Sequence, residues 1–270
     1  MSDATRQQRR REVREQIKAG RQLLGKGLSL QPKAAEIVAV AMVVKAKLDE
    51  AGNARRASEA AELVQTLVET SVAARPPTQQ KIACAKGCAY CCHTFVAVTP
   101  PEAFRLADAV HAGRAAGMTP DAVRTRGKPL IGIPPEARIG GKLPCPLLVD
   151  GACSVYRHRP LACRQATSLD LAACIDEFEG RNLDARVPIS GAYLQYASNA
   201  HITLLGALRA TGLSTEALEL AAALDVVLAT PDAEARWLAG EDVFRDVPRH
   251  APRETQIERA IQHVADALSG

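Results

Sequence analysis

Eight cysteines carry most of the chemical information in this sequence. All of them lie within 91 residues, with none in the first 83 or the last 96. The eight are Cys84, Cys88, Cys91, Cys92, Cys145, Cys153, Cys163 and Cys174. The N-terminus is charged from Asp3 onward and has no apolar core, so it does not read as a secretory signal. We therefore expect a cytoplasmic protein, whose thiols serve metal or redox chemistry rather than forming four disulfides.

The first four cysteines follow the pattern C-x3-C-x2-C-C. Residues three and four apart share one face of a helix, so Cys84, Cys88 and Cys91 could converge from one or two turns. We expect Gly87 to interrupt a regular helix and let the backbone fold around an ion. Zinc takes a tetrahedron of ligands at about 2.3 Å, and iron–sulfur clusters usually take four thiolates. Because Cys92 adjoins Cys91, one of the two is expected to point inward while the other packs, caps or serves another metal.

A second group, Cys145-x7-Cys153-x9-Cys163, is expected to supply the missing ligands. Cys174 follows Ser168, which we expect to cap the N-terminus of a helix, and would then lie about one and a half turns inside it. At that position Cys174 is either a buried packing residue or an additional ligand.

A β-hairpin is expected within the second group. Asp150-Gly151 predicts a two-residue turn between strands at 145–149 and 152–156. In that register Leu148 faces Cys153, and Cys145 faces Tyr156. Strict pleating would put the two cysteines on opposite faces, so a joint site requires the ladder to break near Pro146, which lacks a donor.

Several charged or titratable side chains adjoin the cysteines in the sequence. A metal held by four thiolates carries negative charge, which nearby cations could offset, with ordinary surface ion pairing as the alternative for the arginines. These cations are Lys86, Arg157, Arg159 and Arg164. For His93 we favour an ordinary hydrogen bond over metal binding or proton transfer, and His158 is expected to be structural or neutral between its two flanking arginines.

The spacing of Cys84, Cys88 and Cys91, with Tyr90 before the third, also matches radical S-adenosylmethionine enzymes. Those enzymes resemble a partial α/β barrel, which needs repeated β-α units that this sequence lacks. We therefore rank this interpretation below the others.

Two strings of the sequence resemble the cysteine-cluster proteins of the YkgJ type. C-A-K-G-C-A-Y-C-C at 84–92 is followed by V-A-V-T-P-P-E-A, and C-P-L-L-V-D-G-A-C-S-V-Y-R-H-R-P-L-A-C-R covers 145–164. The family is described as a zinc- or iron-chelating domain and includes a flagellin lysine-N-methylase associated with an iron–sulfur cluster. The resemblance implies metal binding by Cys84, Cys88, Cys91 or Cys92, Cys145, Cys153 and Cys163. It does not cover the N-terminal arm.

Helices are expected on both sides of the cysteine region. Apolar residues at three- and four-residue spacing predict helices within the first 75 residues, and Pro76-Pro77 ends that region. Thr99-Pro100-Pro101-Glu102 reads as a capping box, and Thr119-Pro120 and Thr230-Pro231 repeat its threonine–proline opening. Further helices are predicted at about 190–211, 214–229, 231–239 and 254–268, with Trp237 and Phe244 as core anchors and a short strand at 94–98.

Composition excludes several classes of protein. At 270 residues and 47% hydrophobic content, the chain suits one large domain or two small ones. The longest apolar stretch, about eleven residues at 34–44, is far short of the roughly 20 that span a membrane. Aromatic residues are 3%, which argues against binding nucleic acid by base stacking.

The net charge of +4 conceals a basic N-terminal arm, because residues 1–30 alone carry +5. Its basic side chains are Arg6, Arg9, Arg10, Arg11, Arg14, Lys18, Arg21 and Lys26. A solvated leader helix is the favoured interpretation, and an unknown acidic protein partner is the alternative. This arm is also the one hint of nucleic-acid binding, which we do not expect.

Together these patterns predict a mostly α fold around a small irregular β-hairpin and a cysteine-rich metal centre. The expected parts are an arm with helices at 1–80, a metal-binding core at 81–180 and a helical region at 181–270. The leading hypothesis is a cytoplasmic protein that holds an iron–sulfur cluster, slightly favoured, or zinc. The alternatives are an iron–sulfur enzyme, either an oxidoreductase or similar to a protein lysine methylase, and a zinc-stapled module that binds a partner.

Overall fold

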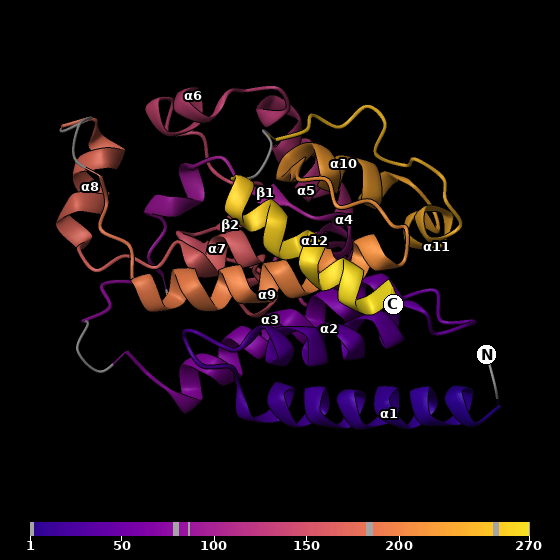
Figure 1. Cartoon of the computed structure of the whole chain (residues 1–270). Helices are drawn as coiled ribbons and strands as arrows, with labels where there is room; N and C mark the ends of the chain where they lie inside the picture. Colours follow the sequence, from indigo (N-terminus) through magenta and orange to yellow (C-terminus); the bar gives the residue numbers. More distant parts are fainter. Residues whose placement is uncertain (1–2, 78–80, 86, 182–185, 251–253, 270) are drawn as a thin grey trace.

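The computed structural model describes residues 3–77, 81–85, 87–181, 186–250 and 254–269. Its N-terminal layer consists of α1 (Asp3–Lys26), α2 (Ala34–Leu48) and α3 (Arg56–Ala74), as the sequence predicts. Figure 1 shows α1 lying along the outer side of α2 and α3. The close approach depends on Gly20, where a Cβ atom would lie 2.0 Å from the carbonyl oxygen of Ala39.

Short helices occupy the middle of the chain. They are α4 (Pro100–His111), α5 (Pro120–Gly127), α6 (Pro135–Gly140), α7 (Leu161–Gln165) and α8 (Leu171–Glu179). Three 3-10 helices accompany them in the described residues: η1 (Tyr90–His93), η2 (Lys128–Leu130) and η3 (Tyr156–His158). Two predicted helix starts are confirmed. Thr99 and Glu102 form the capping box of α4, and the Thr119 hydroxyl accepts a bond from the amide of Ala122 at the start of α5.

The strands are short and antiparallel, which confirms the prediction of a mostly α fold with a small hairpin. β2 (Leu148–Val149) pairs with β3 (Ala152–Cys153), and β1 (Ala97–Val98) pairs with β4 (Leu218–Glu219). The strand predicted at 94–98 is therefore shorter than expected. The described residues contain no parallel strand pair, so the barrel of radical S-adenosylmethionine enzymes is not present.

The C-terminal helices are α9 (Gly191–Ala210), α10 (Leu220–Ala229), α11 (Ala233–Leu238) and α12 (Thr255–Ser269). Two predicted starts are wrong. The helix expected from 214 begins at Leu220, because the backbone of Leu218 and Glu219 pairs with β1. The helix expected from Pro231 begins at Ala233, because Asp232 adopts a left-handed backbone with φ of 53° that ends the turn before it.

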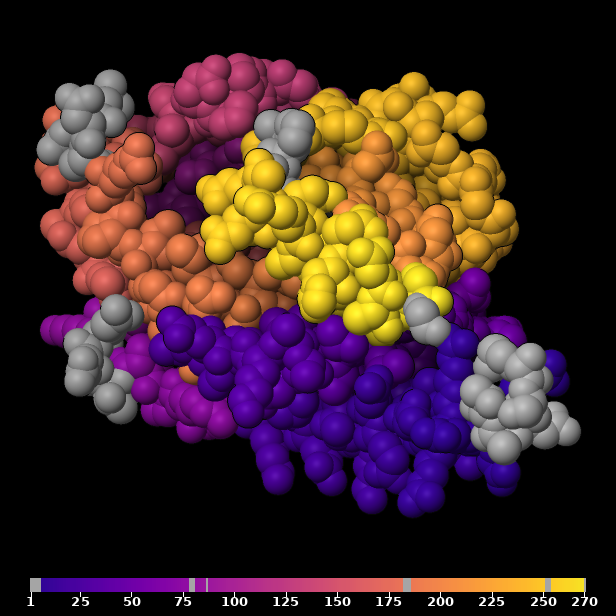
Figure 2. Space-filling model, in the orientation of Figure 1, coloured from indigo at the N-terminus to yellow at the C-terminus, as the bar shows by residue number. Residues whose placement is uncertain are grey.

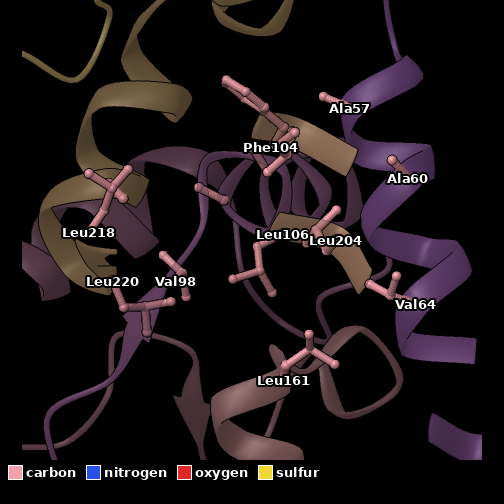
Figure 3. Close-up of a cluster of buried hydrophobic side chains, with 14 of the residues drawn as sticks. Ala57, Ala60, Val64, Val98, Phe104, Leu106, Leu161, Leu204, Leu218 and Leu220 are labelled. Atoms are coloured by element: carbon pink, nitrogen blue, oxygen red, sulfur yellow. The ribbon is translucent and has the colours of Figure 1, made fainter. Parts of the chain in front are cut away.

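One hydrophobic core draws side chains from the first, middle and last thirds of the sequence (Figure 3). Val64 of α3, Leu106 of α4 and Leu204 of α9 are fully buried and lie near one another in this view. Trp237 and Phe244 are core anchors as predicted, since each ring lies 5.5 Å from the ring of Phe104.

The division into parts at 80 and 180 stays a prediction. None of the described helices combines the length and apolarity that a membrane crossing requires.

Candidate metal centre

The first cysteine motif is a loop that leads into a 3-10 helix rather than a regular α-helix. Gly87 interrupts helical structure as predicted, with a left-handed φ of 91°. Cys91 and Cys92 follow in η1, whose backbone the amide of Cys92 stabilises by donating to the carbonyl of Ala89 (2.9 Å). The prediction that Cys84, Cys88 and Cys91 share one helix face is therefore wrong, because Gly87 turns the chain between Cys84 and Cys88 and the 3-10 helix begins only at Tyr90.

The hairpin of the second motif forms with the predicted turn and register. Asp150 and Gly151 both have positive φ, as a two-residue turn between antiparallel strands requires, and Leu148 pairs with Cys153. The predicted pairing of Cys145 with Tyr156 does not form. Instead, the amide of Cys145 donates to the carbonyl of Cys92 over 2.7 Å. The ladder ends beside Pro146, and this hydrogen bond joins the two cysteine motifs.

Cys163 is positioned by α7, whose N-terminus is held by a carboxylate distant in sequence. The Glu102 carboxylate accepts a hydrogen bond from the amide of Leu161 (2.7 Å) while its other oxygen closes the capping box with Thr99. The side chain of Glu102 is 2% exposed. Glu102 therefore fixes the starts of α4 and α7 together, and with them the thiol of Cys163.

Cys174 lies in the first turn of α8, closer to its start than predicted. The N-cap is Asp170, whose carboxylate accepts from the amides of Ala172 and Ala173, and not Ser168. Ser168 has another role, since its amide donates to the sulfur of Cys84 over 3.1 Å. Burial raises the pKa of Cys174, and a hydrogen bond with the Ser168 side chain lowers it. Ser168 thus lies between two of the cysteines.

All eight cysteines are free thiols, and Cys91 is the exposed member of the set. Burial raises the pKa of Cys145 to about 12, and burial with the neighbouring thiols of Cys145, Cys91 and Cys153 raises the pKa of Cys163 well above its ordinary value. Burial likewise raises the pKa values of Cys84 and Cys153. The thiols therefore lie within electrostatic reach of one another, which brings together cysteines from all the predicted groups.

Cys91 and Cys92 have opposite pKa shifts. A hydrogen bond from the Cys92 thiol lowers the pKa of Cys91 to about 7, and the same hydrogen bond, with burial, raises the pKa of Cys92. Both shifts favour one negative charge on Cys91, which the thiol of Cys92 stabilises. Cys91 is therefore the thiol of the pair that deprotonates first.

The cysteine segment lies in a hollow of the molecular surface. Figure 2 shows this hollow between α6, α8 and the start of α12, with the purple chain that follows the first motif at its floor. On α8, the ring of Phe178 lies 5.5 Å from that of Tyr90 and 4.8 Å from that of His93. The amine of Lys142 lies 4.7 Å above the Phe178 ring. These contacts hold α8 over η1.

Of the four cations expected to offset thiolate charge, Arg159 acts on the cysteines. Burial raises the pKa values of Cys153 and Cys163, and the charge of Arg159 opposes both rises. The guanidinium of Arg164 instead pairs with Glu69 at 2.6 Å and donates to backbone carbonyls. It forms an ion pair, as the alternative interpretation expected, but a buried one rather than one on the surface. Lys86 lies outside the described residues, and among the residues that the structure describes the Arg157 side chain, which is exposed, makes no hydrogen bond or ion pair to the cysteines.

The two histidines near the cysteines behave as structural residues. A ring nitrogen of His93 lies 3.1 Å from the carbonyl oxygen of Ala89, which confirms the favoured hydrogen-bonding role. His158 is held neutral as predicted, but from another cause. Burial lowers its pKa most, followed by the charges of Arg105 and Arg114, rather than those of its sequence neighbours.

The donor set has the chemistry of a soft metal site. In the part of the chain that the structure describes, no three His, Cys, Asp or Glu side chains stand in the arrangement of ligands around one ion. The thiols nevertheless suit zinc or an iron–sulfur cluster, because both take several thiolates. Coordination bonds of about 2.3 Å would draw these neighbouring thiols closer together and release their protons.

Three contacts that support the site escaped the sequence analysis. Ser168 bonds to Cys84 across 84 residues, and Glu102 reaches Leu161 across 59. A buried ion pair between Arg138 and Glu219 also lies within electrostatic reach of Cys145. None of these pairs has a local sequence signal, because each depends on how distant segments pack.

Comparison with known proteins agrees with the donor chemistry. Residues 83–183 match the model of the family CxxCxxCC, described as a "putative zinc- or iron-chelating domain". No curated protein and no solved structure matches the chain. The match spans all eight cysteines and the helices α4 to α8 that position them. Residues 83–183 of this chain are thus a cysteine-cluster domain of the CxxCxxCC family.

Proposed function

We propose that this protein is a metal carrier or metalloprotein whose cysteine thiolates hold an iron–sulfur cluster or zinc. The observation that carries the proposal is the meeting of separate cysteine segments. The Cys145 amide bonds to the Cys92 carbonyl, and the Ser168 amide bonds to the Cys84 sulfur. Thiols that the fold brings together from such distant positions in the sequence can bind a metal jointly.

An iron–sulfur cluster is the occupant we favour. Cys145, Cys153 and Cys163 pack against the hydrophobic core, so a centre bound there would have one dry, apolar wall. Such a wall controls the access of solvent to a cluster and thereby tunes the reduction potential of the cluster. The charge of Arg159 would offset part of the negative charge that several thiolates bring to any metal. Free thiols are typical of a reducing compartment, which supports a cytoplasmic location.

Metal retention by Cys153→Ala and Ser154→Ala tests the proposal. The two residues are neighbours and half-buried, but only the first has a thiol. Wild type and Ser154→Ala should retain equal metal after anaerobic gel filtration, and Cys153→Ala should retain less because a thiolate ligand is missing. Equal retention by all three chains, or no metal in any, would count against thiolate ligation.

The basic helix α1 supports a second candidate function, recruitment of an acidic protein. Its eight basic side chains are exposed, and among the described residues none of them forms an ion pair. In Figure 2 the side chains of this indigo helix project from the lower edge of the molecule. Unpaired cations on one helix attract a negatively charged partner over a distance set by salt.

Neutralising four of these arginines tests the second function. The variant carries Arg6→Gln, Arg9→Gln, Arg10→Gln and Arg14→Gln. It should bind immobilised polyglutamate more weakly than wild type, with a smaller dependence on salt, while its metal content stays unchanged. Equal retention of both chains would contradict a recruiting role.

A further inference from the structure

The helix α8 is held to the rest of the chain by few contacts. None of its nine residues is buried, whereas α4, α7, α9 and α10 each bury part of their side chains. It packs mainly against η1 and α6. Its own ion pair, between Asp176 and Arg181, lies within the same segment of chain. Local opening costs least free energy where few side chains are buried, so α8 opens more easily than these neighbours.

The chain that leads into α8 is, by contrast, held firmly by backbone hydrogen bonds. The amide of Leu169 donates to the carbonyl of Pro188 over 2.9 Å, and Ser168 forms an antiparallel bridge with Ile189. On its other side, the carbonyl of Ser168 accepts from the amide of Ala83. This pairing ends before the helix begins, so residues 167–169 form a fixed base about which α8 can turn.

The inner face of α8 lies against the first cysteine motif. Cys174 and Phe178 are four residues apart and therefore share one face of the helix. The Phe178 ring lies 5.5 Å from that of Tyr90 and 4.8 Å from that of His93, the first and last residues of η1. The two adjacent cysteines of η1 lie between these rings in sequence. In this position α8 forms one wall of the hollow above η1 (Figure 2).

Lys142, which follows α6, holds the far end of α8. Its amine lies 4.7 Å from the centre of the Phe178 ring and 2.8 Å from the carboxylate of Glu179. The ion pair is weak, because its side chains are 45% and 43% exposed and water competes for both charges. The backbone of Lys142 has a left-handed φ of 50°, which residues with a side chain rarely adopt. The chain accepts this conformation where it brings the amine to α8.

We propose that α8 is a gate through which metal enters and leaves the thiol site. The helix turns outward about its base when the contacts of Phe178 and Lys142 break, and it closes when they form again. Cys91 is exposed while α8 is closed, but the other seven thiols are half-buried, so a metal held by several of them needs this movement to leave. The inference rests on the proposed function and adds how the site is reached.

The rates of zinc uptake and zinc loss in the full-length chain test the gate. Zinc is the probe because it binds several thiolates without added sulfide. Phe178→Ala removes the ring that packs on η1, so both rates should rise about tenfold. Lys142→Gln removes the contacts at the far end and should raise both rates about threefold. The dissociation constant should stay unchanged, because opening precedes both uptake and loss.

Three variants make these rates interpretable. Phe178→Tyr keeps the ring and should behave as wild type. Lys45→Gln removes another exposed ion pair, with Asp49 at the end of α2, and should leave both rates unchanged. Lys142→Gln alters an exposed side chain and keeps the test valid if Phe178→Ala fails to fold.

The outcomes separate the gate from the proposed function. Equal rates for wild type, Phe178→Ala and Lys142→Gln would overturn the gate and leave the proposed function standing. Faster loss without faster uptake would do the same, because it would show a weaker site rather than an easier opening. A wild-type chain that binds no zinc would overturn the gate, and a chain that holds no iron either would overturn the proposed function as well.

Discussion

Arg159 is the cation whose charge stabilises the thiolate form of the nearby cysteines. Its guanidinium stacks 3.8 Å from the centre of the Tyr156 ring and donates to the Tyr156 carbonyl, so its position is fixed. Burial raises the pKa values of Cys84 and Cys153, and Arg159 opposes both rises. A fixed cation beside the thiols favours the thiolate form that a metal requires.

Replacing this cation should weaken metal binding. We expect Arg159→Gln to retain metal about tenfold more weakly than wild type, in the range known for residues that support metal ligands. Competition with a chelator at pH 7 would measure the loss. Arg157→Gln is the matched control, because Arg157 is exposed and its side chain takes no part in the site. Equal weakening by both variants would contradict a specific role for Arg159.

At the residue scale, the sequence predicted the donors better than their surroundings. Cysteine type and spacing pointed to a thiolate site, and Gly87 to a break in the helix. Which arginine serves the thiols could not be predicted, because Arg157, Arg159 and Arg164 are close in sequence and differ only in where folding places them. The contact between Ser168 and Cys84 is invisible for the same reason.

At the scale of elements, Glu102 joins two helix starts that lie far apart in sequence. Its carboxylate serves the capping box of α4 and accepts from the amide of Leu161 in α7, which carries Cys163. Removing it would leave buried amide donors without partners, which costs about 1–3 kcal/mol for each group. The stability of α4 and the position of Cys163 are therefore coupled.

Glu102→Ala should accordingly lower both stability and metal retention. We expect a loss of about 2–4 kcal/mol in the free energy of unfolding, measured with urea, and a matching decrease in bound metal. Thr119→Ala is the control, because it removes one capping bond from α5 and should cost about 1 kcal/mol without affecting metal. Metal retention unchanged by Glu102→Ala would refute the coupling.

Glu234, at the interface of α11 and α3, makes the stability of the fold depend on pH. Its carboxylate accepts from the amides of Ala57 and Ser58 at the start of α3, over 2.7 and 2.8 Å. Burial raises the pKa of Glu234 to about 7, against an ordinary value of 4.5. The folded chain therefore keeps this proton at pH values where the unfolded chain has lost it, so stability falls as the pH rises from 4.5 to 7.

The variant Glu234→Gln should remove this dependence. Between pH 5 and pH 8, the unfolding free energy of wild type should fall by about 2 kcal/mol relative to Glu234→Gln. Urea unfolding at the two pH values would measure the difference, with the exposed Glu136→Gln expected to follow wild type. If the unfolding free energy of wild type, relative to that of Glu234→Gln, stayed constant or rose between pH 5 and pH 8, the sign of the effect would be contradicted.

Element boundaries followed from local chemistry where that chemistry was strong. The threonine–proline starts at Thr99 and Thr119 were predicted because their capping bonds are local. The third, at Thr230, failed because the turn at Asp232 overrides it. Leu218 was expected in a helix, but its backbone pairs with Val98, a tertiary contact that no local pattern encodes.

At the scale of the whole molecule, one core of packed helices supports the cysteine region, and Cys145, Cys153 and Cys163 pack against it. The helices α2, α3, α9 and α12 pack against one another, and Gly206 of α9 permits close contact, since a Cβ atom there would lie 2.4 Å from a Val264 methyl group. Of the cysteine region, α7 and β2 lie beside α9, whereas α6 and α8 lie farther out (Figure 1). This arrangement was not predictable, because helical periodicity gives the faces of helices but not their partners. The alternative that the protein is an iron–sulfur enzyme stays a prediction.

Removing the metal should consequently loosen one region and spare the rest. We expect a chelator to open the cysteine-bearing segments at 81–93 and 145–179 to limited proteolysis, while circular dichroism retains most of the helical signal of α2, α3, α9 and α12. Mass spectrometry of the fragments would locate the cuts. Loss of the entire helical signal on chelation would contradict this account, because it would mean that the core also depends on the metal.

Metal content is the most direct test of a thiolate centre in this protein. The measurement is the amount of iron, zinc and acid-labile sulfide in anaerobically purified full-length chain, beside its visible spectrum. We predict iron with sulfide and a broad visible absorption. Zinc without colour would keep the centre and change its occupant. A folded chain with all eight thiols free and neither metal bound would contradict the account.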